Sequence, residues 1–328
     1  MARLITVVEQ AGEAAREVGR LTHHRGGDAY TLGITGAPGA GKSTLADGFV
    51  SLAQASSRAS SQKNGSPVSM VVKGPEVAVL AVDPSSPFTG GAILGDRVRM
   101  QAHALEAGVF IRSMATRGAH GGLALATPAA VRVLDAVGAR WVLLETVGVG
   151  QVEVDVAGTA DTTVVVLNPG WGDGVQASKA GLLEVADVFV VNKADRPGAA
   201  EVRRDLQLMV DLAGERRADE AASVAPPWRP PILTTVASTG EGVAEVWAAI
   251  EAHRTHGAQS GELARRRSNR VSNEIRSLVA RHLDEAARRA CVGPRFESVR
   301  DSVLARRLDP WTAADQLVPA FVEVTEQQ

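Results

Sequence analysis

Nine residues near the start of the chain have the types and spacing needed to bind phosphate. Two glycines stand at a fixed distance before a lysine and a serine, in a run of Gly36, Ala37, Pro38, Gly39, Ala40, Gly41, Lys42, Ser43 and Thr44. Glycines let backbone N–H groups wrap phosphate oxygens, Lys42 can reach the β- and γ-phosphates, and the Ser43 hydroxyl is a ligand for Mg²⁺. The spacing therefore predicts a P-loop.

A second motif concerns the base of a bound nucleotide. Asn192, Lys193, Ala194 and Asp195 follow an apolar run that is typical of a buried strand. In this position Asp195 could accept hydrogen bonds from the N1–H and the exocyclic amine of guanine, a donor pair that adenine lacks. A site that pairs with polar groups of its ligand rejects a ligand without them. We therefore expect GTP and GDP to bind rather than adenine nucleotides.

Acidic residues form the third candidate group. The apolar run 141–144 is followed by Glu145, Thr146, Val147 and Gly148. In this position Glu145 could support Mg²⁺ through water or polarise the attacking water. The N–H of Gly148 could approach the γ-phosphate. Asp83 and Asp96 are further carboxylates for the metal site, although capping a helix is an alternative role for Asp96.

The pattern of apolar residues indicates the elements that would position these groups. Strands are predicted at 31–35, 77–83, 109–114, 141–146, 162–168, 188–192 and 232–237. Helices are predicted at 4–20, 45–55, 127–138, 173–185, 199–212 and 264–290, with another starting at 96–100. Irregular surface segments are expected at 55–74 and 211–231. Strands that alternate with helices predict an α/β fold, with a doubly wound, mostly parallel sheet and helical extensions at both ends.

Bulk properties narrow the class of protein. The chain has 328 residues, 45% of them hydrophobic, and a formal net charge of −2, which does not favour nucleic acid as a partner. A single cysteine excludes a disulfide within the chain, and no apolar run is long enough to span a membrane or resembles a signal peptide. We expect a cytoplasmic protein.

Three regions are predicted along the chain. Residues 1–30 form an N-terminal helical extension, 31–256 a P-loop nucleotide-binding domain, and 257–328 a C-terminal helical arm. The arginine-rich face of that arm is interpreted as a solvated surface, with contact to a partner or to a second copy of the chain as the alternative.

In these motifs the chain resembles the MeaB/ArgK/MMAA family of P-loop GTPases. The resemblance runs through almost the whole chain and includes His253 and Arg254. Its motifs lie at 36–44, 82–86, 95–100, 145–151, 192–195 and 308–314. Val236 stands where the family usually has serine, yet the backbone N–H of Ala237 can still meet the guanine carbonyl.

The resemblance implies a homodimeric GTPase that serves as a chaperone for an adenosylcobalamin-dependent acyl-CoA mutase, usually methylmalonyl-CoA mutase. GTP binding and hydrolysis would gate cofactor delivery and protect the mutase. The family pattern places Lys42 and Ser43 at phosphate and Mg²⁺, and Asn192, Lys193 and Asp195 at guanine. It also implies an acidic set of Asp83, Asp96 and Glu145 around metal and water, a loop at 169–176 that responds to the mutase, and a catalytic role for Lys179.

Two other functions remain open. A nickel-delivery GTPase of the HypB/UreG kind would need a metal-binding cluster, and the seven histidines form no convincing ligand set. A kinase that passes the γ-phosphate to an acceptor is the other alternative, as the name ArgK suggests. A P-loop by itself is compatible with both functions.

Overall fold

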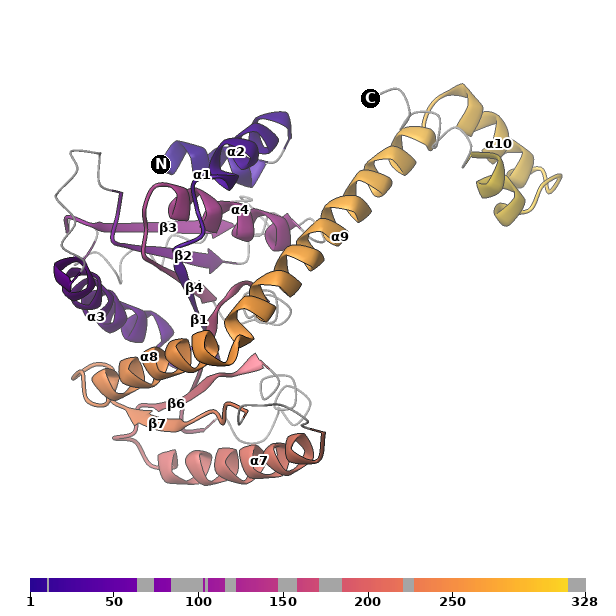
Figure 1. Ribbon diagram of the computed structural model, residues 1–328. Helices are drawn as coiled ribbons and strands as arrows, with labels where there is room; N and C mark the ends of the chain where they lie inside the picture. Colours follow the sequence, from indigo (N-terminus) through magenta and orange to yellow (C-terminus); the bar gives the residue numbers. More distant parts are fainter. Residues whose placement is uncertain are drawn as a thin grey trace. The chain divides into compact units, whose positions relative to one another are not determined.

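A parallel sheet with strand order β3-β2-β4-β1-β5-β6-β7 forms the centre of the protein (Figure 1). The computed structural model describes residues 1–10, 12–63, 74–83, 103, 106–115, 122–146, 158–170, 185–220 and 227–317. All pairings between neighbouring strands are parallel, which confirms the predicted sheet. The strands are β1 (Tyr30–Gly36), β2 (Val77–Asp83), β3 (Val109–Ala115), β4 (Trp141–Thr146), β5 (Thr162–Leu167), β6 (Val188–Asn192) and β7 (Ile232–Thr235).

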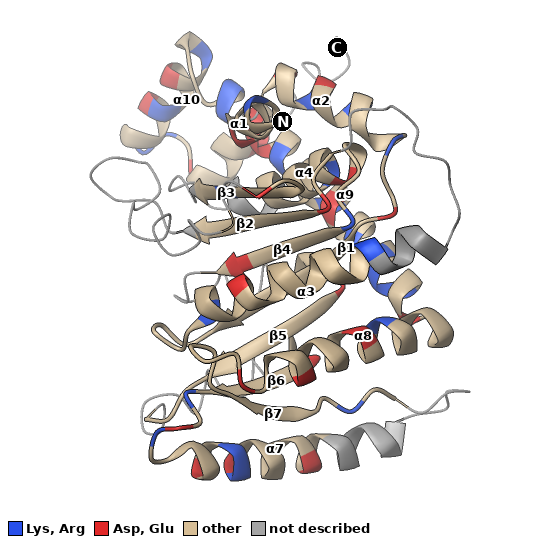
Figure 2. Ribbon diagram, turned by 90° about the vertical axis from the view of Figure 1, so that its left-hand side faces the viewer, with Lys and Arg blue, Asp and Glu red and all other residues tan. Residues whose placement is uncertain are grey.

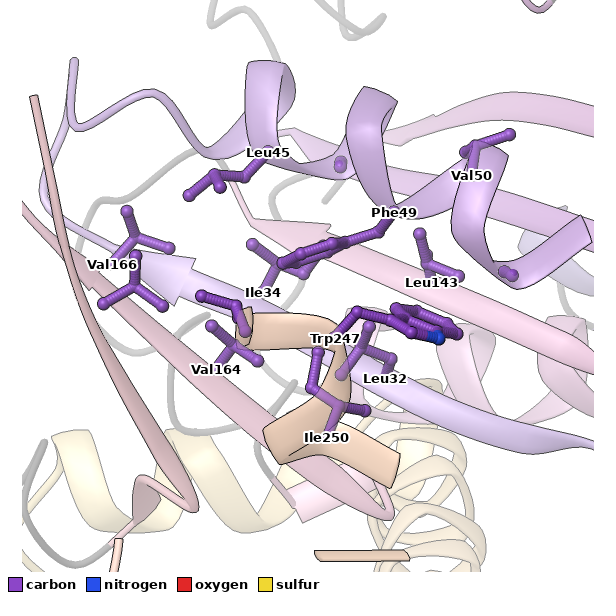
Figure 3. Close-up of a cluster of buried hydrophobic side chains, with 14 of the residues drawn as sticks. Leu32, Ile34, Leu45, Phe49, Val50, Leu143, Val164, Val166, Trp247 and Ile250 are labelled. Atoms are coloured by element: carbon purple, nitrogen blue, oxygen red, sulfur yellow. The ribbon is translucent and has the colours of Figure 1, made fainter. Parts of the chain in front are cut away.

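Helices α3 (Lys42–Lys63) and α8 (Val243–Ser260) cover one face of this sheet. In Figure 2 both helices lie side by side in front of the strands. Their apolar side chains meet those of the central strands, as Figure 3 shows for Phe49, Trp247 and Ile34. The helix that begins at the P-loop is thus fixed by burial against the sheet.

Other helices cover the opposite face. Helices α1 (Ala2–Gln10) and α4 (Gly122–Ala136) pack on β2 and β4, where Ile5 of α1 is fully buried. Helix α7 (Ala199–Glu220) packs on β6 and β7. Successive residues of a strand therefore point into different clusters, and both faces need apolar side chains. This burial explains why continuous apolar runs predicted these strands.

The N-terminal segment differs from the single helix predicted at 4–20. It forms α1 and α2 (Glu13–His23), and Gly12 precedes α2 with a φ of 87°. Glycine adopts this backbone conformation without the steric cost that a side chain would add. The apolar periodicity continued across the break, so the pattern alone did not reveal it.

Two segments predicted to be irregular are partly helical. Helix α3 continues to Lys63, although the region 55–74 was expected to be a surface loop. Ser57 is buried, and the hydroxyl of Ser56 donates to Glu251 at 2.8 Å, so tertiary contacts hold this serine-rich turn. Helix α7 likewise continues to Glu220, into the region 211–231. Both predictions were wrong at the helix ends. For α3 the reason is that propensity is a weak guide where packing contributes.

The C-terminal part of the chain is helical as far as it is described. The protein divides into two compact units, Met1–Arg267 and Ser268–Gln328, and α9 (Glu262–Ala290) runs through this boundary. The second unit also contains α10 (Pro294–Leu304) and a helical stretch at 310–317. Within the described residues, no helix is both long and apolar enough to cross a membrane.

Candidate functional site

The predicted nucleotide-binding motifs meet at the carboxyl edge of the sheet. Strand β1 leads into the P-loop, β4 ends with Glu145 and Thr146, and β6 ends with Asn192. Because all these strands are parallel, their carboxyl ends lie along one edge. Ligands of open α/β sheets bind at such an edge, near the point where the strand order reverses.

The P-loop backbone requires glycine at defined positions. Gly36, Gly39 and Gly41 have φ values of 130°, 71° and 93°, where L side chains are rarely found. A Cβ at Gly36 would lie 2.0 Å from the carbonyl oxygen of Val166, and one at Gly41 would lie 2.3 Å from Nδ2 of Asn192. The glycines therefore allow close approach of the loop to β5 and to the guanine motif.

The loop offers hydrogen-bond donors that fit phosphate. The N–H groups of Gly39, Gly41, Ser43 and Thr44 donate to no backbone carbonyl of the described residues. These groups lie at the N-terminus of α3, where aligned peptide dipoles favour anions. Lys42 is 6% exposed, and its ammonium donates to the carbonyl oxygens of Gly36 at 2.8 Å and Ala37 at 2.9 Å. Its charge is therefore held against the loop.

The residues present also fit a magnesium ion. The Ser43 hydroxyl donates a hydrogen bond to Oε1 of Glu145, so a serine from α3 and a carboxylate from β4 are in direct contact. Glu145 is only 6% exposed. Hydroxyl and carboxylate oxygens are ligands that Mg²⁺ prefers. The site described so far has one hydroxyl and one carboxylate. Elsewhere among the described residues, no three or more His, Cys, Asp or Glu side chains gather as ligands for a metal ion.

The guanine motif is tied to the P-loop by its first two residues. Asn192 is 2% exposed, and its Nδ2 donates to the carbonyl of Ala40 at 2.7 Å. Lys193 has a φ of 58°, and its Nζ donates to the carbonyl of Gly39 at 2.6 Å. Asp195 is exposed, so its carboxylate is accessible to a ligand.

The turn after β7 adds two residues to this arrangement. Oδ1 of Asn192 accepts hydrogen bonds from the N–H of Ala237 and from the hydroxyl of Thr235, both at 3.0 Å. The sequence predicted a role for Ala237 but not for Thr235. The available signal was the position of this threonine two residues before Ala237.

Several predicted site residues lie outside the described residues. These are Asp96, Gly148 and Lys179, together with most of the loop at 169–176. Asp83 ends β2, next to β3 and β4, but its side chain is not described. The backbone of Asp83 is therefore at the carboxyl edge of the sheet, where the P-loop, Glu145 and Asn192 also lie.

A buried polar network at the opposite, amino edge was not predicted. Asp187 precedes β6, is 3% exposed, and accepts two hydrogen bonds of 2.8 Å from the guanidinium of Arg266. Asp161 precedes β5 and accepts hydrogen bonds of 3.1 and 2.8 Å from Arg267. These paired contacts hold the start of α9 against the sheet.

His253 of α8 extends this network. Its Nδ1 lies 2.7 Å from the Thr162 hydroxyl, and its Nε2 lies 3.3 Å from Oδ1 of Asp187. Burial away from water lowers the pKa of His253, although the Asp187 carboxylate opposes this shift. The neighbouring Tyr30 bonds to the same hydroxyl at 2.6 Å, and burial raises the pKa of Tyr30 to about 12. His253 and Tyr30 are therefore neutral structural groups at pH 7.

Residues 1–291 match the family described as methylmalonyl-CoA mutase-associated GTPase MeaB. The chain belongs to this family. Like the relatives that carry the name GTPase, it is a GTP-hydrolysing P-loop protein. The carboxyl-edge residues are the candidate nucleotide site of this MeaB-family GTPase.

Similar proteins occur in distant organisms. A protein of Pyrococcus abyssi named as a GTPase is 45% identical over 98% of this chain and 92% of its own length. A mouse protein named methylmalonic aciduria type A homolog, mitochondrial, is 32% identical over 89% of this chain and 65% of its own length. The crystal structure of a LAO/AO transport system kinase covers 98% of this chain and 92% of that protein, with a TM-score of 0.62 and 23% identity, and shows the same fold.

Proposed function

We propose that this MeaB-family GTPase is a Mg²⁺-dependent chaperone of an adenosylcobalamin-dependent acyl-CoA mutase, with methylmalonyl-CoA mutase as the expected partner. It would gate cofactor loading and protect the mutase from inactivation. The family description and the name of the mouse relative support the partner. The observation that carries the chemistry is the contact between Ser43 and Glu145 beside the donors of the P-loop.

Each group of residues in the site would have a separate role in GTP hydrolysis. The Lys42 ammonium and the N–H groups of the P-loop would bind and orient the phosphates, and Asp195 and Ala237 would bind guanine. Ser43 and Glu145 would hold Mg²⁺, with Asp83 and Asp96 as the further carboxylates that the family resemblance implies; the bound ion would supply neutralisation of phosphate charge. Lys179 and the N–H of Gly148 would complete the site. Positioning contributes most of the catalysis in phosphoryl transfer, so docking of a partner could accelerate the reaction.

The partner is tested by measuring GTP hydrolysis with and without purified methylmalonyl-CoA mutase. We expect slow hydrolysis alone and faster hydrolysis with the mutase, in a complex whose stability depends on the bound nucleotide. The Lys42→Ala variant should hydrolyse no GTP in either condition while keeping the wild-type circular dichroism spectrum. Absence of both acceleration and a nucleotide-dependent complex would refute the chaperone role and leave the GTPase activity intact.

The metal is tested in the same assay by adding EDTA and then restoring Mg²⁺. Hydrolysis should stop and recover, and Glu145→Gln should raise the Mg²⁺ concentration needed for half-maximal rate. A rate that is independent of Mg²⁺ would contradict the assignment of Ser43 and Glu145. Transfer of labelled phosphate to an acceptor, rather than its release, would instead support a kinase.

An apolar stripe on α9 supports a homodimer. Its members are 41–56% exposed and recur at helical spacing, at Val271, Ile275, Leu278, Val279 and Leu283. Such a stripe is costly in water and is buried when two helices pair. Ile275→Asp should give a monomer by light scattering. Asn273→Asp adds the same charge away from the stripe and should leave the dimer intact; a monomeric wild-type protein would refute the proposal.

A further inference from the structure

Two aspartates occupy equivalent places at the amino edge of the sheet. Asp161 directly precedes β5, and Asp187 directly precedes β6. Each donates its own N–H to a carbonyl of the neighbouring strand, and its carboxylate accepts the N–H of that same residue. Asp161 pairs in this way with Thr31 at 2.8 and 3.0 Å, and Asp187 with Thr163 at 2.9 Å in both bonds. The two aspartates therefore fix how β5 pairs with β1 and how β6 pairs with β5.

Consecutive arginines at the start of α9 supply the positive charges for these carboxylates. Arg266 donates to both carboxylate oxygens of Asp187, and Arg267 donates to both carboxylate oxygens of Asp161. Asp161 and Asp187 are 1% and 3% exposed, so each paired contact is made to a buried charge. Removing an arginine would take a cation from a carboxylate that water does not reach, which is costly.

The strands held in this way are those that carry the candidate nucleotide site. Arg267 also donates to the carbonyl of Ala29 at 2.9 Å, directly before β1. At its other end β1 leads into the P-loop, and β6 ends with Asn192. Strand β5 lies between them, and its Val166 carbonyl accepts the N–H of Ala37 in the P-loop at 3.2 Å. The placement of the P-loop beside β5 and β6 therefore depends on strand pairings that begin at the two aspartates.

We infer that the first turns of α9, residues 262–267, are an allosteric contact of the nucleotide site: their docking on the amino edge and nucleotide binding at the carboxyl edge strengthen each other. The inference rests on the proposed nucleotide site. Release of these turns removes a cation from two buried aspartates, so the strand pairings there loosen in a local opening. Nucleotide binds the paired strands more tightly than the loosened ones, and by linkage it favours docking equally. Because α9 continues to Ala290, a contact made by its later turns can act on nucleotide affinity through this docking.

The experiment measures amide hydrogen exchange of the full chain with and without GDP. In the wild type, GDP should slow exchange at 262–267, although these residues lie at the edge of the sheet opposite the proposed site. Helix α1 packs on β2 and β4 and serves as the internal reference, where GDP should change exchange less. In Arg267→Gln, exchange at 262–267 should be faster than in the wild type. Labelled GDP should bind this variant about 5- to 150-fold more weakly, because the nucleotide-free protein populates the released state.

Arg265→Gln is the matched control, because the Arg265 side chain is 72% exposed and its ion pair is with Glu262 of the same helix, at 3.7 Å. It removes the same charge and should leave GDP affinity and exchange at wild-type values. Arg267→Lys keeps the charge without the paired donors and should bind GDP with intermediate affinity.

A merely structural contact would lower Tm in Arg267→Gln without any dependence of exchange on nucleotide. GDP that binds the wild type without slowing exchange at 262–267, or that slows α1 equally, would overturn the inference and leave the proposed nucleotide site intact. A wild-type protein that binds no GDP would refute that site and the inference together. If Arg267→Gln does not fold, the exchange of the wild-type protein decides the question by itself.

Discussion

Replacing Gly41 by alanine should destabilise the nucleotide-free protein more than the same replacement at Gly39. Both glycines have positive φ values, 93° and 71°, so alanine is strained at either position. Their surroundings differ. A Cβ at Gly41 would lie 2.3 Å from Nδ2 of Asn192, whereas a Cβ at Gly39 would have no neighbour within 4 Å.

The two contributions can be estimated separately. The left-handed backbone costs an L residue about 1–2 kcal/mol, and this cost applies at both positions. At position 41 the buried amide of Asn192 must also move and lose its bond of 2.7 Å to the Ala40 carbonyl. Such a loss in a buried site costs about 1–3 kcal/mol. Gly41→Ala should therefore be less stable than Gly39→Ala by about 1–3 kcal/mol.

The assay is thermal unfolding of both variants without nucleotide. A difference of 1 kcal/mol lowers Tm by about 2–4 °C in a domain of 150–250 residues, so the two curves should be clearly separated. Equal Tm values would refute the reasoning, because they would mean that Asn192 accommodates the methyl group without losing its bond. A GTP-binding measurement would then show whether the tether between Asn192 and the P-loop has any role.

Other predictions concern the amino edge of the sheet. Asp187→Ala leaves the half-buried guanidinium of Arg266 with Glu262 as its remaining carboxylate partner. Loss of the charged hydrogen bonds should lower the free energy of unfolding by about 1.5–3 kcal/mol in denaturant titrations. Because burial lowers the pKa of His253, the unfolded chain binds this proton more tightly. Stability should therefore fall as pH drops below about 6.5, the ordinary histidine value. His253→Gln should flatten this part of the stability curve measured by calorimetry, and an unchanged slope would contradict the assigned role.

The sheet could be predicted closely because burial on both faces leaves a plain signal. The predicted bounds of β2, β4 and β6 agree with the structure, and each of these strands is a continuous apolar run that ends in one or two polar residues. Helix ends were less predictable. The end of α3 carries small and polar residues whose burial depends on α8 and on the neighbouring Arg140, and no local pattern reveals such contacts.

The motifs predicted to bind nucleotide could be recognised in the sequence, since each is contiguous and its residue types have a defined chemical role. Their mutual contacts could not. Thr235 and Asn192 are 43 positions apart, and their hydrogen bond exists because β6 and β7 are neighbours in register. Threonine is common in strands for its shape alone, so its hydroxyl gives no sign of a partner before the pairing is known.

Variants at the two edges of the sheet should reduce GTP hydrolysis for different reasons. At the carboxyl edge, the N–H groups of Gly39 and Ser43 donate to no backbone carbonyl of the described residues, so a ligand can use them. At the amino edge, Asp187 already receives the Arg266 guanidinium and lies beside His253. A variant there should lose activity through lower stability of the nucleotide-free protein. Lys42→Ala at the carboxyl edge should instead lose hydrolysis with little change in that stability, so Tm without nucleotide separates the two causes.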